Sequence, residues 1–379
     1  MKIIYKLLFL FLLTIGYSSC DFLDIVPDEI TTEADAFKDR NAAKNFVYSC
    51  YGYLPQSNVA SGSLDLLTGD EVITAFEHET FASFPKGNYT ASSPVISYWN
   101  TFFQGLRQCY IFLENVDKVP DLTESVKTDY IAQVKFLIAY YHYQLARCYG
   151  PIILIKELPD VNASQAEYLP RTSYDECVDW ICNLLDEAAS SLPAIRTNKE
   201  DYGLATSVGA KAVKAKMLLY AASPLFNGNS SFYSNFTDKS GSQLMPLTYD
   251  PNKWVKAKTA IKEAIDLAEQ NGHALYVKQD YKIGNEDANP YPAAGPVRCL
   301  RTSLVDWDSR NPEVLLAETR SEGSYGIQNK SLPFVTDGWA WNGVGPTWTM
   351  LNRFYTKNGL PWDEDPEYKD KDKLKIVNV

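Results

Sequence analysis

Apolar side chains recur at helical spacing through most of the chain. The clearest stripe lies in residues 123–149, where apolar positions follow one another at intervals of three or four: Tyr130, Val134, Leu137, Tyr141, Leu145 and Cys148. Gly150-Pro151 ends this pattern. The same spacing predicts helices over residues 33–54, 96–116, 123–149, 173–192, 206–222 and 252–271. Consecutive helices of this kind pack as antiparallel pairs, which predicts a tetratricopeptide-like scaffold.

The pattern changes after residue 284. Residues 285–379 are rich in Gly, Pro, Trp and Asn, and only short strands are expected there, such as residues 313–319. Residues 55–94 form a long Ser-, Gly- and Pro-rich loop inserted into the helical part. The predicted fold is therefore mainly α. A helical-pair scaffold spans residues 33–284, and a loop-rich, aromatic-rich subdomain spans residues 285–379. The long inserts at residues 151–172 and 223–251 interrupt any fixed period of about 34 residues.

The N-terminal residues have the pattern of an export signal. Lys2 and Lys6 precede the apolar run LLFLFLLTI, and small residues then lead to Cys20. The run is shorter than the about 20 residues that span a bilayer. The arrangement looks like a bacterial lipobox, with residues 1–19 removed, Cys20 lipidated and residues 20–32 forming an extended leader. An ordinary signal cleaved near Ser19, with Cys20 left as a thiol, is the alternative.

Charge and cysteine spacing exclude several classes of function. The formal net charge of −11 becomes −13 when Lys2 and Lys6 leave with the signal, which argues against nucleic-acid binding. Neutral ligands, cations and basic partners remain open. The other six cysteines are irregularly spaced and contain no CxxC, so a zinc or redox site has no support. Buried thiols are favoured over disulfides.

No catalytic motif is evident. The chain lacks HExxH, GxSxG and a Walker loop, and His78, His142 and His273 are far apart in sequence. His142 is expected to be a packing residue. The acidic runs at 306–308 and 363–365 lack the spacing of a calcium loop. We therefore predict no catalytic residue, no metal site and no cofactor.

Aromatic loops supply the candidate ligand-binding residues. Sugar rings pack their C–H faces on flat aromatic rings, while their hydroxyl groups need polar partners. The candidates combine such rings with polar neighbours: Trp339, Trp341 and Asn342; Trp307, Asp308 and Arg310; Asp70 and Glu71. Alternatively, these tryptophans only hold loops against the scaffold. Trp99 and Trp254 lie on helical stripes and are expected in the core.

Several segments together resemble the SusD/RagB family of outer-membrane nutrient-binding lipoproteins. They are CDFLDIVP after the signal, KFLIAYYHYQLARCYGPIILI, KAVKAKMLLYAASPLFNG, the Trp254 helix, NPEVLLAETR and GPTWTMLNRFYTKNGLPW. The resemblance implies a surface-exposed, lipid-anchored protein of the outer membrane that captures glycans or other nutrients. It also implies a partner, a TonB-dependent transporter of the SusC type. Family members continue beyond the Asp365-Pro366 segment, so the resemblance implies that final scaffold helices are missing here.

Two other functions compete with nutrient binding. A structural or adhesin-type surface lipoprotein would polymerise or contain a sheet-rich C-terminal body. A glycoside-acting enzyme would need a pair of carboxylates, and among 47 acidic residues no pair stands out.

Overall fold

The computed structural model describes residues 33–55, 69–160, 162, 169–277, 295–305, 311–319, 326–332 and 341–369. The signal, the leader with Cys20, and the candidates Trp307, Asp308, Arg310 and Trp339 lie outside these residues. Within them the chain is mainly α, as predicted. The long helices are α3 (Arg40–Tyr51), α5 (Trp99–Asn115), α6 (Glu124–Tyr149), α7 (Tyr174–Ser191), α8 (Ser207–Ala222) and α10 (Asn252–Gln270).

Shorter elements complete the described chain. The short helices are α2 (Glu33–Ala36), α9 (Ser230–Tyr233), α11 (Pro296–Val305), α12 (Gly326–Ser331) and α13 (Trp348–Leu351), with 3-10 turns η2 (Thr80–Ser83), η3 (Val116–Lys118) and η5 (Lys199–Asp201). The strands are β1 (Val72–Thr74) and β2 (Val344–Pro346). No helix in this part of the chain combines the length and the apolar character needed to cross a bilayer.

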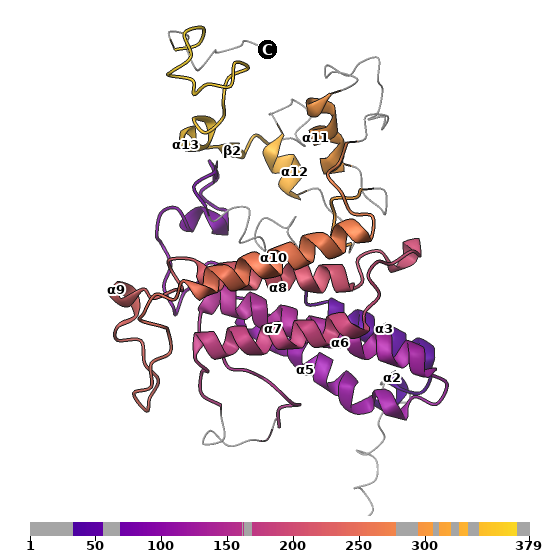
Figure 1. Cartoon of the computed structure of the whole chain (residues 1–379). Helices are drawn as coiled ribbons and strands as arrows, with labels where there is room; N and C mark the ends of the chain where they lie inside the picture. Colours follow the sequence, from indigo (N-terminus) through magenta and orange to yellow (C-terminus); the bar gives the residue numbers. More distant parts are fainter. Residues whose placement is uncertain are drawn as a thin grey trace, which may run out of the picture.

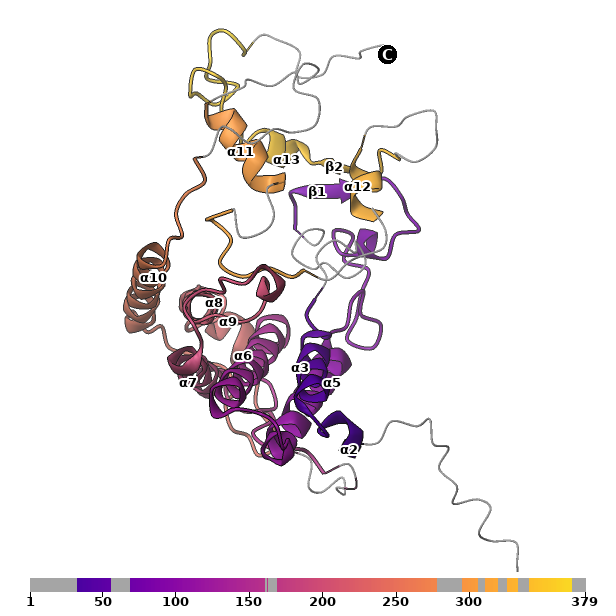
Figure 2. The same cartoon turned by 90° about the vertical axis from the view of Figure 1, so that its right-hand side faces the viewer.

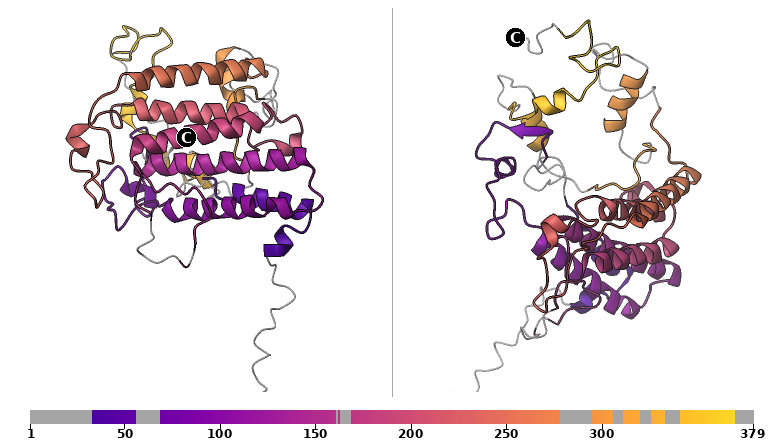
Figure 3. Two further views of the ribbon diagram at one scale, coloured as in Figure 1. Left: turned by 60° about the horizontal axis from the view of Figure 1, so that its bottom comes forward. Right: turned by 60° about the vertical axis from the view of Figure 1, so that its left-hand side comes forward.

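The long helices stack in sequence order. α3 packs on α5, α5 on α6, α6 on α7, α7 on α8 and α8 on α10. Figure 1 shows the helices as a layered block, and Figure 2 looks along their axes. The left view of Figure 3 shows α5, α6, α7, α8 and α10 lying side by side. The predicted scaffold of successive helix pairs is confirmed.

Helix α6 is at the centre of this stack. Its buried residues occupy every face, because α3, α5, α7 and α8 surround it. Tyr141 and Phe102 stack with ring centroids 5.7 Å apart, and the Tyr141 hydroxyl donates to the Cys50 carbonyl. One hydrophobic cluster runs through these helices and includes α6 from Ala132 to Ala146.

His142 joins α6 to the extended segment that follows it. Its Nδ1 donates to the Ile138 carbonyl at 2.8 Å, and the Ile155 amide donates to Nε2 at 3.1 Å. The Tyr110 hydroxyl donates to the Ile155 carbonyl at 2.6 Å. Side chains therefore satisfy both backbone groups of Ile155, and the apolar run at 152–155 packs in the core without a partner strand.

The last helix pair packs through small residues. Ala257, Ala260, Ala264 and Ala268 form the buried stripe of α10 at intervals of three or four. Alanine side chains let α10 approach α8 closely, where Ala215 belongs to the same cluster. Trp254, expected in the core, is instead 41% exposed, because the contact face of α10 is this alanine stripe. Trp99 packs partly buried against the main core.

The strand expected at residues 313–319 is absent. This segment lies against the N-terminal end of α8, where Gly203 and Gly209 leave room for it. A Cβ at Gly203 would come within 2.9 Å of the Thr319 side chain. Contact with a helix end replaces pairing with another strand. Buried thiols were predicted for six cysteines and are found at Cys50, Cys109, Cys177 and Cys182. Cys148 and Cys299 are only partly buried, and none of the six forms a disulfide.

Strands β1 and β2 join segments from the two ends of the described chain. They pair antiparallel, with Val72 opposite Pro346, Ile73 opposite Gly345 and Thr74 opposite Val344. The buried Phe81 ring packs against Val72 and Val344. Figure 2 shows β1 and β2 beside α12 and α13, on the far side of the chain from α2.

Burial of His142 predicts a pH-dependent loss of stability. Burial lowers the pKa of His142 from 6.5 to about 4, although the hydrogen bond to Ile138 opposes the shift. The unfolded chain therefore binds this proton more readily than the folded one. The stabilisation is complete above pH about 6.5 and is lost as the pH falls towards 4, by about 3 kcal/mol.

Urea unfolding at several pH values between 7.5 and 4 measures this contribution. The control is His142→Gln, whose amide does not titrate. We expect this variant to be less stable at pH 7.5 and the difference from wild type to shrink as the pH falls. A constant difference over the whole range would contradict the assignment.

Close packing at Gly343 predicts a steric defect. A Cβ at Gly343 would lie 2.0 Å from Cε2 of Phe76, so Gly343→Ala forces the ring to move. We expect a cost of about 1–3 kcal/mol in local stability, measured by hydrogen exchange at β1. Gly345→Ala, two residues further on and within β2, is the matched control, because a Cβ there meets nothing within 4 Å. Adding Phe76→Ala to Gly343→Ala should remove the clash. Equal hydrogen exchange in Gly343→Ala and Gly345→Ala would refute this interpretation.

Candidate ligand-binding surface

The small sheet gathers predicted site residues from opposite ends of the chain. We call the surface formed by residues 70–79 and 341–355 around β1 and β2 the platform. Asp70 and Glu71 precede β1, while Trp341 and Asn342 precede β2. Since the strands are antiparallel, backbone pairing fixes both segments to one sheet. The antiparallel register places Asp70 and Glu71 beside Thr347 at one end of the platform, and Trp341 and Asn342 beyond Ala75 at its other end.

Asp70 and Glu71 are anchored through their backbones. Thr347 donates its amide to the Glu71 carbonyl at 2.9 Å and its hydroxyl to the Asp70 carbonyl at 2.6 Å. The Arg353 guanidinium lies 3.5 Å from the Asp70 carboxylate and 4.0 Å from that of Glu71. All three charged side chains are at least half exposed, so these ion pairs add little stability and leave the groups accessible to a ligand.

Trp341 and Asn342 are held by a run of backbone hydrogen bonds. The amides of Trp341, Asn342 and Gly343 donate to carbonyls at the end of α12, at 2.9, 2.8 and 2.6 Å. Asn342 has a φ of +48°, a left-handed conformation that Asn adopts more readily than most residues. The sharp bend therefore falls at Asn342. Trp341 is 40% exposed beside it.

An ion pair fastens α12 to the early loop. The Lys330 ammonium contacts the Glu79 carboxylate, and both side chains are largely buried. The Phe76 ring stacks on the exposed His78 ring with centroids 5.5 Å apart. Contacts around β1 and β2 therefore hold the platform in shape independently of any ligand.

Further exposed rings follow β2 and were not singled out by the sequence. Trp348 in α13 is 47% exposed, and Phe354 and Tyr355 are still more exposed. Arg353 precedes this pair in sequence. Their segment, WTMLNRFY, contributed to the family resemblance. A search for aromatic residues next to Arg in a loop would have found them. Together with Trp341 they give the platform several flat apolar faces.

The chemistry of the platform is that of binding. Aromatic faces can stack on apolar ligand surfaces, and the neighbouring carboxylates, guanidinium and amide can hydrogen-bond to hydroxyl groups. Among the described residues, no group of three or more His, Cys, Asp or Glu side chains is placed to hold a metal ion.

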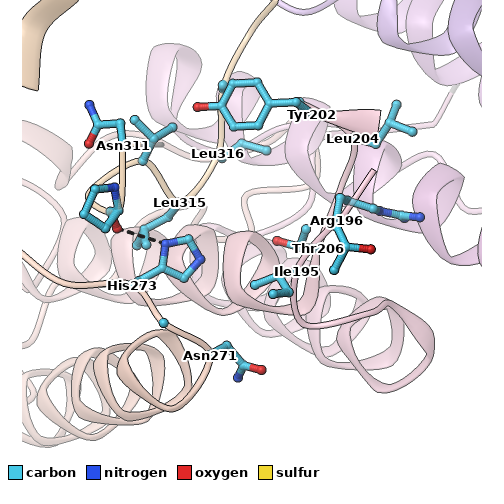
Figure 4. Close-up of a pocket in the computed structure, with 16 residues that line it drawn as sticks. Ile195, Arg196, Tyr202, Leu204, Thr206, Asn271, His273, Asn311, Leu315 and Leu316 are labelled. Atoms are coloured by element: carbon cyan, nitrogen blue, oxygen red, sulfur yellow. Dashed lines mark hydrogen bonds between the residues drawn. The ribbon is translucent and has the colours of Figure 1, made fainter. Parts of the chain in front are cut away.

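A separate cavity of about 330 Å³ lies at the N-terminal end of α8 (Figure 4). Its walls come from residues 195–206, from the turn after α10 and from residues 311–317. Leu315 and Leu316 form part of one wall, and His273 and Tyr202 point into the same space. The sequence did not predict this cavity, because its walls come from three loops with no shared motif.

A protein-family model covers more than half of the chain. The family is described as starch-binding and associating with the outer membrane, and its SusD-like model matches residues 21–219. A SusD-like protein, P25, from Formosa agariphila is 23% identical over 230 residues, which are 57% of this chain and 43% of that protein.

Solved structures share the fold. The structure titled BT4246 has a TM-score of 0.73 at 30% identity and covers 87% of this chain and 59% of its own. A SusD-like protein from Bacteroides fragilis has a TM-score of 0.63 at 19% identity and covers 88% of this chain and 56% of its own. The chain thus spans about half of the length of the relatives it matches. The family match, together with the helical scaffold that these structures share, shows that the chain belongs to the SusD-like family.

Proposed function

We propose that this chain is a cell-surface lipoprotein that binds a nutrient glycan on its platform. The observation that carries the proposal is that the exposed rings of Trp348, Phe354 and Tyr355 lie close in sequence to Arg353, which pairs with Asp70 and Glu71 on a braced surface. Membership of a family described as starch-binding and associating with the outer membrane supports the ligand class and the location.

Glycan chemistry matches the platform. A sugar polymer presents flat C–H faces that stack on rings such as Trp341 and Trp348, and its hydroxyl groups can pair with Asp70, Glu71 and Arg353. An exposed, ring-bearing surface suits an extended polymer better than an enclosed cavity does. The candidates Trp339, Trp307, Asp308 and Arg310 remain proposals as further ligand contacts. We propose binding without catalysis, since neither the sequence motifs nor the platform suggest a reaction.

Removing a platform ring should weaken glycan binding. We expect Trp341→Ala and Trp348→Ala each to raise the Kd about tenfold, because a stacked aromatic face contributes on the order of 1 kcal/mol or more. Calorimetry against a panel of soluble glycans, starch among them, measures this. Trp254→Ala is the matched control, since this indole has a similar exposed fraction on the scaffold.

Two outcomes would count against the proposal. One is the absence of binding to any glycan in the panel by the unaltered chain. The other is an equal loss of affinity in the Trp254→Ala control. Measuring released reducing ends in the same samples separates binding from turnover, and sustained release would favour the enzyme alternative.

We further propose that an acylated Cys20 tethers the chain to the outer membrane. Two or more acyl chains provide stable anchoring, since each buried methylene contributes about 0.8 kcal/mol. Metabolic labelling with a fatty acid should mark the wild-type chain, and Cys20→Ala should abolish the label and release the protein from membranes. An unlabelled wild-type chain would disprove the tether.

The proposed partner is a TonB-dependent transporter of the SusC type. A lipid-anchored binder needs a route for its ligand through the outer membrane, and such a transporter supplies one. Affinity purification of the tagged chain from detergent-solubilised membranes should recover the transporter. Recovery of the chain alone, with its lipid anchor intact, would speak against a stable complex.

A further inference from the structure

The cavity at the N-terminal end of α8 is formed by residues separate from the platform. Figure 4 shows His273 and Leu315 on one side and Ile195 and Thr206 on the other, with Tyr202 across the top. Its volume of about 330 Å³ lies at the lower end of the roughly 300–1,000 Å³ range of small-molecule pockets. The space suits a compact ligand better than a polymer.

The wall formed by residues 311–317 is fixed by hydrogen bonds. The Pro312 carbonyl accepts from Nδ1 of His273 at 3.0 Å and from the Ala274 amide at 3.3 Å. Asn311 is buried and donates from Nδ2 to the Ser303 carbonyl at 2.8 Å. Its Oδ1 accepts from the Glu313 amide at 3.1 Å. A wall held in this way does not have to be ordered when a ligand binds.

The opposite wall is fixed by Arg196. Its guanidinium makes a bidentate contact with Asp129, at 2.9 and 2.8 Å, and also donates to the Ala205 carbonyl. Figure 4 shows the guanidinium pointing away from the cavity. Arg196 therefore lines the wall with the aliphatic part of its side chain, while its charge is paired with Asp129.

The cavity is neutral in character. No Asp or Glu side chain lines it, and the Arg196 charge is paired with Asp129. By contrast, two other hollows of the described chain are lined in part by carboxylates, from Glu269 and Glu313 in one and from Asp175 in the other. A charged ligand would lose hydration without gaining an unpaired partner, so the lining favours an uncharged molecule.

The polar groups of the walls match hydroxyl groups. Because Nδ1 of His273 donates to Pro312, a neutral imidazole presents Nε2 as an acceptor, and Figure 4 shows this nitrogen on the side facing Ile195. The Thr206 hydroxyl accepts from the Gly209 amide at 3.0 Å, which leaves its proton available for donation. A ligand hydroxyl can both donate and accept, so neighbouring hydroxyls satisfy both walls.

We propose that this cavity is a second ligand site, which binds a neutral hydroxylated molecule of one or two sugar rings independently of the platform. Ile195, Leu315 and Leu316 contact the C–H faces of the ligand, while His273 and Thr206 bind its hydroxyl groups. The site does not rest on glycan binding at the platform, because the two sites share no residue.

Filling the cavity tests the proposal. Ile195 is 40% exposed at the rim, so Ile195→Trp replaces a smaller aliphatic side chain with a bulky indole in this space without removing a core contact. The control is Leu225→Trp, at a 46% exposed position that does not line the cavity. The probes are methyl glucoside, methyl galactoside, maltose and glucuronate, added to the purified full-length chain and followed by saturation-transfer NMR.

We expect at least one neutral probe to bind with saturation and glucuronate to bind at least tenfold more weakly. Ile195→Trp should weaken the neutral probe at least tenfold, while Leu225→Trp and the platform variant Trp341→Ala leave it unchanged. The proposal would be overturned if no neutral probe saturated the protein, or if Ile195→Trp bound the neutral probe as wild type does. It would also be overturned if glucuronate bound as tightly as the neutral probe. Loss of this signal in Trp341→Ala would assign the sugar to the platform instead.

A second variant keeps the test valid if Ile195→Trp does not fold. In His273→Asn the shorter amide can still donate to Pro312 from the position of Nδ1, but the Nε2 acceptor is gone. We expect this variant to keep the wild-type thermal midpoint within a few degrees and to bind the neutral probe at least fivefold more weakly. Wild-type affinity in a folded His273→Asn protein would refute the proposed hydrogen bond and the site with it.

Discussion

The antiparallel pairing of β1 with β2 is the interaction on which the platform depends. Three paired residues in each strand attach Asp70 and Glu71 to the same sheet as Trp341 and Asn342. Closing so long a loop costs entropy, although this cost grows only slowly with length. A ladder this short cannot offset it alone. The buried Phe81 and the Lys330–Glu79 ion pair supply the additional contacts that hold the two segments together.

Local periodicity explains why the scaffold could be predicted and the platform could not. The apolar stripe from Tyr130 to Cys148 repeats within a few residues, and α6 ends at Gly150 as expected. By contrast, β1 and β2 have only three residues each, and β2 contains Gly345 and Pro346. Neither shows the alternation of a longer strand. Residues 313–319 resembled a strand, but their contacts are with the end of α8.

The chemical character of the candidate residues was easier to predict than their arrangement in space. Asp70, Glu71, Trp341 and Asn342 were each identified from residue type and neighbours. Nothing in the sequence showed that both pairs would flank one small sheet, or that Arg353 would lie beside both carboxylates. The bend at Asn342 depends on the carbonyls at the end of α12. His273 had no recognised role, because its partner at Pro312 becomes a neighbour only through tertiary packing.

The buried cysteines have a consequence for the export that we propose. Burial raises the pKa of Cys177 to about 11 and that of Cys182 to about 12, and it raises the pKa of Cys109 well above its usual value. The thiolate is the species that attacks a disulfide, and it is scarce in these surroundings. Native packing therefore protects these sulfurs kinetically. On that export route, the vulnerable period of these thiols would be the interval between translocation and folding, when an unfolded chain exposes them to oxidants.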